Sequence, residues 1–269
     1  MVVQIPQNDL KDFLPLFKDH RYLKNAIRAV PSQSIARGFT DDLEKPRVVL
    51  FIIDWLCFLA GEPKSPQAEN LLSKIPERTP ILISNEDWLP LMSQKWGRVG
   101  TGKRVTFSTE SLDLEHIRTF LQSIPTGFSL HKVDIDIAKQ LDTDTWFHIT
   151  KYFGGVENFV KKGIGFAIID DLEDKIATLA SSYYPYSESL EIDIVTIDKY
   201  RRRGFATIAC AKLIEYCLEN GIEPHWDAAN DHSVQLALKL GYTNPEPYTL
   251  YGWLKEWVET KELEETRNG

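Results

Sequence analysis

A stretch of three arginines followed by a glycine, residues 201–206 (Arg-Arg-Arg-Gly-Phe-Ala), carries the clearest chemical signal in this sequence. It joins an alternating segment over 190–197, which predicts a strand, to an amphipathic segment over 206–220, which predicts a helix. Backbone N–H groups at the start of a helix, together with the helix dipole, bind anions such as a pyrophosphate. Gly204 lets a ligand approach because it has no Cβ, Ala206 is small for the same reason, and the arginines attract phosphates. The pattern therefore predicts a phosphate-binding turn.

A second glycine-rich stretch, residues 97–104 (Gly-Arg-Val-Gly-Thr-Gly-Lys-Arg), nearly matches a nucleotide-binding P-loop. Arg104 stands where that motif needs a Ser or Thr to bind magnesium. The expected order is also reversed, because a helix precedes the stretch and a strand follows it. We therefore interpret these residues as a loop and not as a nucleotide site.

Size and composition favour a folded protein of two domains. The chain has 269 residues, of which 43% are hydrophobic and 11% aromatic, so sizeable cores can form. Its formal net charge is −8 and its pI is about 5.3. Nucleic-acid binders show the opposite balance, so we expect no nucleic-acid partner. An acidic surface suits a cationic partner such as an amine.

The cysteines and histidines indicate neither a disulfide framework nor a metal site. The chain has three cysteines, Cys57, Cys210 and Cys217. An odd count without repeating spacing excludes a disulfide framework. Cys210 and Cys217 are seven residues apart, on one face of a helix, so we expect them to pack in a core. The histidines do not cluster at ligand spacing, so no metal is expected.

No segment reads as a membrane span or a signal peptide. The most apolar stretch, residues 48–60, contains Asp54 and is shorter than the roughly 20 residues that cross a bilayer. Buried strands are the better interpretation. The first ten residues lack a basic region followed by an apolar run. We therefore expect a cytoplasmic protein without a membrane partner.

The predicted elements follow a similar order in both halves of the chain. Each half shows helices, a β-meander, a helix, a strand and a further helix. An acidic turn, Asp-Asp-Leu-Glu, occurs between two strands in each half, within 41–44 and within 170–174. A turn at 125–127, Pro-Thr-Gly, predicts a boundary between domains 1–126 and 127–269. A tandem of two related folds is one interpretation, although so short an acidic turn recurs easily by chance.

Residues 191–206 resemble the signature motif of the GNAT acyltransferases, whose core is Gln/Arg-x-x-Gly-x-Gly/Ala. Residues 226–242, from Trp-Asp-Ala-Ala-Asn-Asp-His-Ser to Leu-Gly-Tyr, resemble that family's second helix-and-strand block. The match covers about residues 127–252. The whole chain further resembles the GNAT subgroup that includes the zwittermicin A resistance acetyltransferases.

This resemblance implies an α/β (α+β) fold. A GNAT fold with a mixed, largely antiparallel central sheet would occupy residues 127–269. A second α/β domain over residues 1–126, a degenerate GNAT-like half, would precede it and help to shape the acceptor pocket.

The resemblance also implies acetyl-CoA as cosubstrate, without a metal. Pantetheine would lie along the strand that precedes the turn, and backbone N–H groups of the turn would hold the pyrophosphate. The start of the later helix would contact the coenzyme as well. The expected cofactor-binding residues are Val195, Thr196, Ile197, Arg202, Arg203, Gly204, Phe205, Ala206, Thr207, Asn230 and Ser233.

In the mechanism that the resemblance implies, a neutral amine attacks the thioester directly while a strand N–H polarises the acetyl carbonyl. An amine is mostly protonated at neutral pH, so a base must remove its proton. The family's base is commonly a Glu six residues before the strand's closing aliphatic residue. Counting back from Ile197 gives Glu191. Asp193 lies on the same face of the strand and is the reserve candidate.

One position departs from the family's pattern. Many relatives carry a Tyr seven residues after the asparagine of the second block, and this Tyr reprotonates the thiolate. Here that position is Ala237. Tyr242 is a candidate for the acid, with Tyr248, Tyr251 or water as alternatives.

The expected acceptor is the primary amine of a small molecule, such as an amine-bearing antibiotic. The missing tyrosine at position 237 motivates an alternative, in which the protein is a non-catalytic coenzyme A-binding sensor or interaction module. The oligomeric state is open, with a homodimer as one option.

Overall fold

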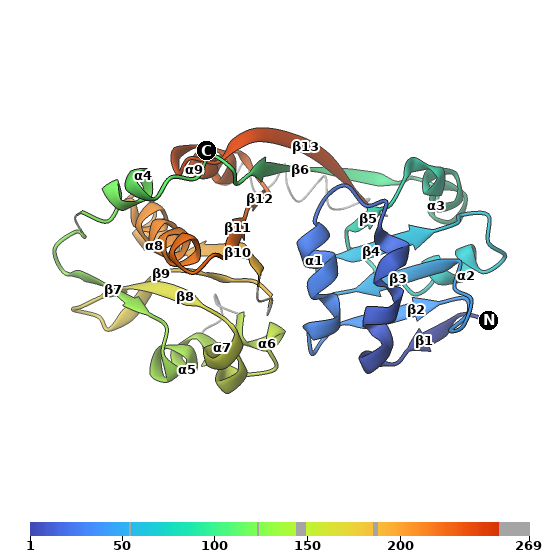
Figure 1. Ribbon diagram of the computed structural model, residues 1–269, viewed down its shortest axis with the longest axis horizontal. Coiled ribbons are helices and arrows are strands. Elements are labelled where there is room, and N and C mark those ends of the chain that lie inside the picture. The colour runs from blue at the N-terminus through green and yellow to red at the C-terminus, as the bar shows by residue number, and fades with distance from the viewer. Residues whose placement is uncertain (54, 123, 144–148, 185–187, 253–269) are drawn as a thin grey trace. The chain divides into compact units, whose positions relative to one another are not determined.

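The computed structural model describes residues 1–53, 55–122, 124–143, 149–184 and 188–252, and the chain forms two compact units (Figure 1). Unit 1 consists of Met1–Pro31, Ala36–Arg104 and Pro247–Gly269, and unit 2 of Ser32–Ile35 and Val105–Glu246. The units differ in extent from the expected domains 1–126 and 127–269, which stay a prediction.

Unit 1 is built on a mixed sheet in the order β1-β2-β3-β4-β5-β13. Each of β1 to β4 is antiparallel to its neighbour, whereas β4 and β5 are parallel. The apolar stretch at 48–60 forms β3 and β4, which are almost entirely buried. Such strands are apolar throughout because packing covers both of their faces. The strands are β1 (Val3–Ile5), β2 (Arg37–Thr40), β3 (Val48–Ile52), β4 (Cys57–Gly61), β5 (Ile81–Ile83) and β13 (Thr243–Gly252).

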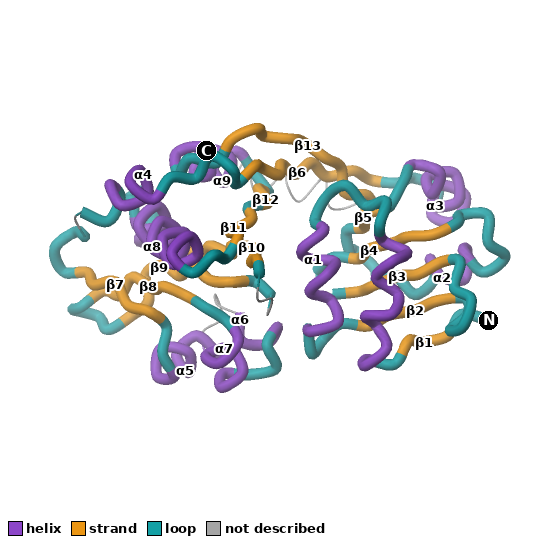
Figure 2. Tube along the Cα trace, viewed as in Figure 1, coloured by secondary structure: helices purple, strands orange, loops and turns teal. Residues whose placement is uncertain are grey.

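The helices of unit 1 lie before β2 and around β5 along the chain, and η1 and α2 pack on this sheet (Figure 2). They are η1 (Gln7–Phe17), α1 (Lys24–Ala29), η2 (Val30–Ser32, which ends in unit 2), α2 (Ala68–Leu72), η3 (Glu86–Trp88) and α3 (Leu89–Trp96). Asn85 caps the start of η3, since its side chain accepts a hydrogen bond from the Asp87 N–H.

Unit 2 is built on the sheet β11-β10-β9-β8-β7. One core lies between this sheet and α8, and a second core includes residues of α5, α6 and α7. The strands are β7 (Phe128–Lys132), β8 (Gly165–Asp170), β9 (Lys175–Ser182), β10 (Ser189–Thr196) and β11 (Glu223–His225), with β12 (Asp227–Ala228) outside this sheet. The helices are α4 (Leu114–Thr119), α5 (Ile135–Thr143), α6 (Ile149–Tyr152), α7 (Val156–Lys162), η4 (Asp198–Tyr200), α8 (Phe205–Glu219) and α9 (Asp231–Lys239).

The two units share one strand topology. In each, three antiparallel pairings are followed by one parallel pairing, with a helix between the last two strands. The strands β1 to β5 thus correspond in order and direction to β7 to β11. The tandem of two related folds is therefore confirmed at the level of topology.

The last strand of each half of the chain leaves the unit in which that half begins. In β6 (Gly100–Ser108), residues up to Arg104 belong to unit 1, and residues from Val105 belong to unit 2. There β6 pairs with β12, with Thr106 opposite Asp227. In return, the end of β13 belongs to unit 1, where Tyr251 lies opposite Ile81 of β5. The final strand of the second half thus extends the sheet of unit 1, whereas β6 pairs with β12 outside the five-stranded sheet of unit 2.

Residues 223–228 form two strands, β11 and β12, which belong to different sheets and are separated by Trp226. Strand β6 begins at Gly100, so the glycine-rich stretch at 97–104, which was expected to be a loop, is partly strand. This stretch follows helix α3, and no helix begins directly after it, whereas a P-loop leads from a strand into a helix.

Candidate functional site

The parallel strands β10 and β11 diverge after a short paired stretch. They pair only where Ser189, Leu190 and Glu191 face Glu223, Pro224 and His225. Beyond Glu191, β9 remains paired with β10 as far as Thr196. On the other side of β10, the described chain supplies no partner strand, because the segment after His225 joins β12. Trp226 holds this departure in place, since its ring is buried in the core beside α8.

The divergence leaves an edge of β10 without a partner strand in the described chain, and on this edge the Thr196 carbonyl accepts a 3.4 Å hydrogen bond from Arg201 Nε. The Glu191 carbonyl accepts a hydrogen bond from the Tyr183 N–H, and the Ile197 N–H donates to the Ala177 carbonyl. Alternation along an antiparallel strand then directs the backbone groups of Ile192, Ile194 and Thr196 away from β9. Of the three expected pantetheine contacts, Thr196 therefore turns its backbone toward the opening, while Val195 and Ile197 turn theirs toward β9.

The turn that follows β10 is open at the predicted phosphate position. Arg202 and Gly204 have positive φ angles of 62° and 83°. A Cβ on Gly204 would meet no atom within 4 Å. Gly204 is the N-cap of α8, and no side chain caps this helix end. The first bond within the helix runs from the Ile208 N–H to the Gly204 carbonyl. The N–H groups of residues 205–207 therefore remain available to an anion.

Aromatic residues fix this turn to the sheet. The Tyr200 hydroxyl donates a 2.9 Å hydrogen bond to the Asp170 carboxylate at the end of β8. The rings of Phe205 and Phe128 lie 4.5 Å apart. The Arg203 guanidinium lies 5.6 Å from the Phe128 ring centre and 5.8 Å from that of Tyr200. The turn is thus held by side chains that leave its N–H groups free.

The arginines differ in their partners. Arg201 pairs with Asp198 at 2.8 Å. Arg202 is exposed, and within the described chain it has no ion pair. Its charge is therefore available to a ligand at the turn.

Helix α9 places further groups beside the turn. The Asn230 side chain accepts a 3.0 Å hydrogen bond from the Ser233 N–H and so caps α9. The Ser233 hydroxyl in turn accepts from the Trp226 indole N–H at 3.0 Å. At the other end of α9, the Lys239 ammonium lies 3.4 Å from the Thr207 hydroxyl in the first turn of α8. The two expected coenzyme contacts on α9 thus have local roles in shaping its start.

The position of the missing tyrosine is a core position. Ala237 is fully buried in the cluster beside α8. Tyr242 is also buried, and its hydroxyl donates a 2.9 Å hydrogen bond to the Pro224 carbonyl. Burial raises the pKa of Tyr242 well above its usual value. The hydroxyl proton of Tyr242 is therefore held in a hydrogen bond to the backbone of β11.

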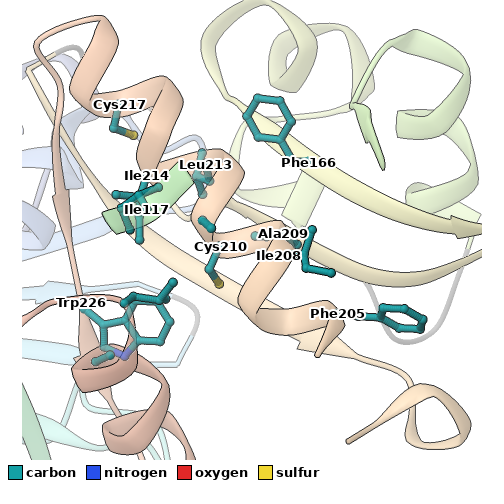
Figure 3. Close-up of a cluster of buried hydrophobic side chains, with 14 of the residues drawn as sticks. Ile117, Phe166, Phe205, Ile208, Ala209, Cys210, Leu213, Ile214, Cys217 and Trp226 are labelled. Atoms are coloured by element: carbon teal, nitrogen blue, oxygen red, sulfur yellow. The ribbon is translucent and has the colours of Figure 1, made fainter. Parts of the chain in front are cut away.

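The core around α8 is apolar and includes both helix cysteines (Figure 3). Cys210 and Cys217 are fully buried, which confirms their predicted packing role. Burial raises the pKa of the Cys217 thiol to about 12. Within the described residues, no group of three His, Cys, Asp or Glu side chains could hold a metal ion. Among the same residues, no helix has the length and apolarity to cross a membrane.

The two candidate bases lie on the face of β10 opposite α8. Leu190, Ile192 and Ile194 pack toward α8, so alternation places Glu191 and Asp193 on the other face. Glu191 lies across from Tyr183, which directly follows β9, and Asp193 lies across from Ser181 of β9. Desolvation raises the pKa of Asp193 to about 6, although the Ile194 N–H acts in the opposite direction. The pairing register that brings Ser181 beside Asp193 has no signal in the sequence.

Comparison with known proteins identifies the family. A family model described as GNAT acetyltransferase matches residues 15–251. The uncharacterized N-acetyltransferase YdfB of Bacillus subtilis (strain 168) is 25% identical over 248 residues, which cover 87% of this chain and 92% of that protein. A GCN5-related N-acetyltransferase-like protein from Streptococcus suis 89/1591 has a crystal structure with a TM-score of 0.78 and 26% identity, covering 91% and 98% of the two chains.

A tandem GNAT protein from the clavulanic acid biosynthesis pathway shares the fold. Its TM-score is 0.59 at 13% identity, and the match covers 93% of this chain and 96% of that chain. The family model spans most of the sequence, including both units and the whole of the β10–α8 site. The chain therefore belongs to the GNAT acetyltransferase family, whose general cosubstrate is acetyl-CoA, and it is an N-acetyltransferase.

Proposed function

We propose that this enzyme transfers the acetyl group of acetyl-CoA to the primary amine of a small molecule at the β10–α8 site. One observation carries the proposal: β10 diverges from β11 and then leads into a turn whose N–H groups are uncapped. The first feature offers an open strand edge to pantetheine, and the second offers donors to a pyrophosphate. The resemblance to zwittermicin A resistance acetyltransferases supports an amine-bearing antibiotic as one acceptor of this kind.

The proposed coenzyme contacts follow one path along β10 and the turn after it. Residues 195–197 would accompany the pantetheine, chiefly through the Thr196 backbone. The N–H groups of residues 202–207 would bind the pyrophosphate, with the Arg202 charge beside them. Asn230 and Ser233 would shape the adjoining start of α9. An edge N–H of β10 would donate to the acetyl carbonyl as negative charge develops on its oxygen.

Glu191 is the proposed general base, with Asp193 as the second candidate. The acceptor amine must lose a proton as its nitrogen attacks the thioester carbon. A new C–N bond then forms, the C–S bond breaks, and the thiolate takes up a proton. Because the Tyr242 hydroxyl is bound to Pro224, water is the better source of that last proton.

The experiment is a titration of the purified chain with acetyl-CoA, followed by a thiol-release assay with a broad panel of amines. We expect binding, and turnover with at least one amine class. Glu191→Gln should abolish turnover while leaving acetyl-CoA affinity within about twofold. No heat and no thermal shift at saturating acetyl-CoA would remove the basis of the proposal.

The alternative function is a coenzyme A-binding sensor without catalysis. Two observations favour it: Ala237 occupies the position of the usual acid, and the Tyr242 hydroxyl is engaged in the core. If the chain bound acetyl-CoA but released no thiol with any amine, the sensor function would be favoured over catalysis.

A further inference from the structure

Asp193 is a partly buried carboxylate without a counter-charge. In the described parts of the chain, no Lys, Arg or His lies within ion-pair distance of it. A carboxylate removed from water is costly unless a cation or several hydrogen bonds compensate. Its raised pKa, about 6 through desolvation, reports that cost. A cationic ligand beside Asp193 would offset this desolvation cost.

Ser181 adds a second uncompensated group at the same place. It lies directly across from Asp193 in the β9–β10 register, with its side chain on the same face. Ser181 is fully buried, and among the described residues its hydroxyl has no hydrogen-bond partner. The same is true of Ser189, two residues before Glu191 on β10. An unpaired buried hydroxyl is destabilising because it gives up its bonds to water without replacement. This face of the sheet therefore carries polar groups whose partners are not supplied by the fold described.

Aromatic rings border the same face. Tyr183 follows β9 and lies across from Glu191, with its N–H bonded to the Glu191 carbonyl. Its ring lies 4.5 Å from the Tyr152 ring of α6. Tyr183 and Asp193 are diagonal neighbours on this face, because Tyr183 lies across from Glu191 and Ser181 lies across from Asp193. A tyrosine ring beside a carboxylate attracts an organic cation by its π-face as well.

We propose that Asp193, supported by Ser181 and bordered by Tyr183, binds a second, protonated amine of the acceptor, so that the substrate class is a diamine or polyamine. This inference rests on the proposed function. Glu191 would take the proton from the reacting amine, while the second amine keeps its proton and remains bound as an ammonium. Asp193 would thereby select the acceptor without taking part in the proton transfer. Ser181, opposite Asp193 in the register, would act as a positioning residue by donating a hydrogen bond to the carboxylate when the ammonium is bound.

The test uses matched pairs of amines. Thiol release is measured with linear α,ω-diamines of three to six carbons and with the monoamine of each chain length. We expect the wild type to prefer at least one diamine over its monoamine by about tenfold or more in kcat/KM. Asp193→Asn should raise KM for that diamine at least about tenfold and so remove most of its preference over the monoamine, while acetyl-CoA affinity changes by less than about twofold. Ser181→Ala should raise the same KM about threefold with kcat unchanged.

The control is Asp136→Asn, which removes an exposed carboxylate of α5 and should leave every parameter unchanged. Thermal unfolding establishes that each variant is folded, and Asp193→Glu should restore part of the diamine preference. Equal loss of kcat for diamines and monoamines in Asp193→Asn would overturn the inference, because it would make Asp193 a base.

A binding measurement keeps this inference separate from the proposed function. Calorimetric titration of the coenzyme A complex with each amine should show tighter binding of the preferred diamine in the wild type and not in Asp193→Asn. Monoamine turnover with no diamine preference in rate or binding would overturn the subsite alone. Loss of acetyl-CoA binding or of all turnover would instead count against the proposed function, and the same titration of the chain without coenzyme A would still decide on the subsite.

Discussion

The hydroxyl of Tyr200 donates a 2.9 Å hydrogen bond to the carboxylate of Asp170, and this bond ties the turn after β10 to the end of β8. Unit 1 repeats the arrangement, since the Ser65 hydroxyl in the turn after β4 donates to Asp41 at the end of β2. An acidic residue thus anchors the same turn in both halves of the tandem. The two anchored turns differ in the backbone N–H groups and the strand edge that they leave available to a ligand.

Removal of the Tyr200 hydroxyl should weaken coenzyme binding. Tyr200→Phe keeps the ring against Phe205 but loses a hydrogen bond to a charged group, worth about 1.5–3 kcal/mol. We expect acetyl-CoA affinity to fall at least about fivefold by calorimetry, because the turn loses its tie to β8. Tyr216→Phe is the matched control, because it removes a tyrosine hydroxyl from α8 away from the turn. Equal effects of the two substitutions would contradict the role given to Tyr200.

A side chain at Gly204 should block the phosphate position. Gly204 and Gly221 both have positive φ, and a Cβ at either residue would meet no atom within 4 Å. Gly204→Val and Gly221→Val should therefore destabilise the fold similarly, by about 1–2 kcal/mol. Only Gly204→Val should reduce acetyl-CoA affinity, by about tenfold or more. Normal affinity in a folded Gly204→Val protein would show that the coenzyme binds elsewhere.

The chain should bind one acetyl-CoA. In unit 1 the strands β4 and β5 remain paired to Leu59, and the Ser84 N–H donates to the Leu59 carbonyl, so little of the β4 edge is open. The turn at 62–67 contains Pro63 and Pro66, which lack N–H donors, and α2 is short. We expect a calorimetric stoichiometry of one. A value of two would show that unit 1 has kept a site.

The Asp41 anchor should make stability depend on pH. Burial alone would raise the Asp41 pKa, but hydrogen bonds from the Arg47 and Val48 N–H groups and from Ser65 outweigh it, so the pKa lies below its usual 3.8. A carboxyl whose pKa is lowered by folding stabilises the fold above about pH 4, and this contribution disappears as the pH falls through the lowered pKa. Urea unfolding from pH 7 to pH 3 should show a decline that is smaller in Asp41→Asn. Asp136→Asn should retain the wild-type decline.

The three cysteines should be unreactive in the folded chain. Cys57, Cys210 and Cys217 are buried, and burial raises the pKa of Cys57 and Cys217 to about 12. Thiolate is the reactive form, so a disulfide reagent at pH 8 should label none of them natively and all three in denaturant. Rapid labelling of the native chain would contradict the packing around α8.

Local patterns in the sequence predicted the centre of the site. Alternation over 190–197, the glycine turn and the apolar helix face are all short-range signals, and β10, the turn and α8 lie where they were expected. The Asn230 cap is of the same kind. Such features depend on neighbours within one turn or a few residues, so the sequence is enough to predict them.

Other features depend on which strand pairs with which. The divergence beyond Glu191 arises because Trp226 is drawn into a core, and the contact between Ser181 and Asp193 arises from register. The exchange of β6 and β13 likewise depends on partners that are distant in sequence. No periodicity encodes these choices, since a strand's hydrophobic pattern fixes its face but not its neighbour.

The exchange of final strands makes the two halves of the tandem inseparable as folding units. A chain cut between residues 126 and 127 would deprive β5 of its neighbour β13 and β12 of its neighbour β6. Bare strand edges recruit other strands and promote aggregation. A gene fragment encoding either half alone would therefore yield an insoluble product, so neither half of the tandem could be lost without exposing a strand edge of the other.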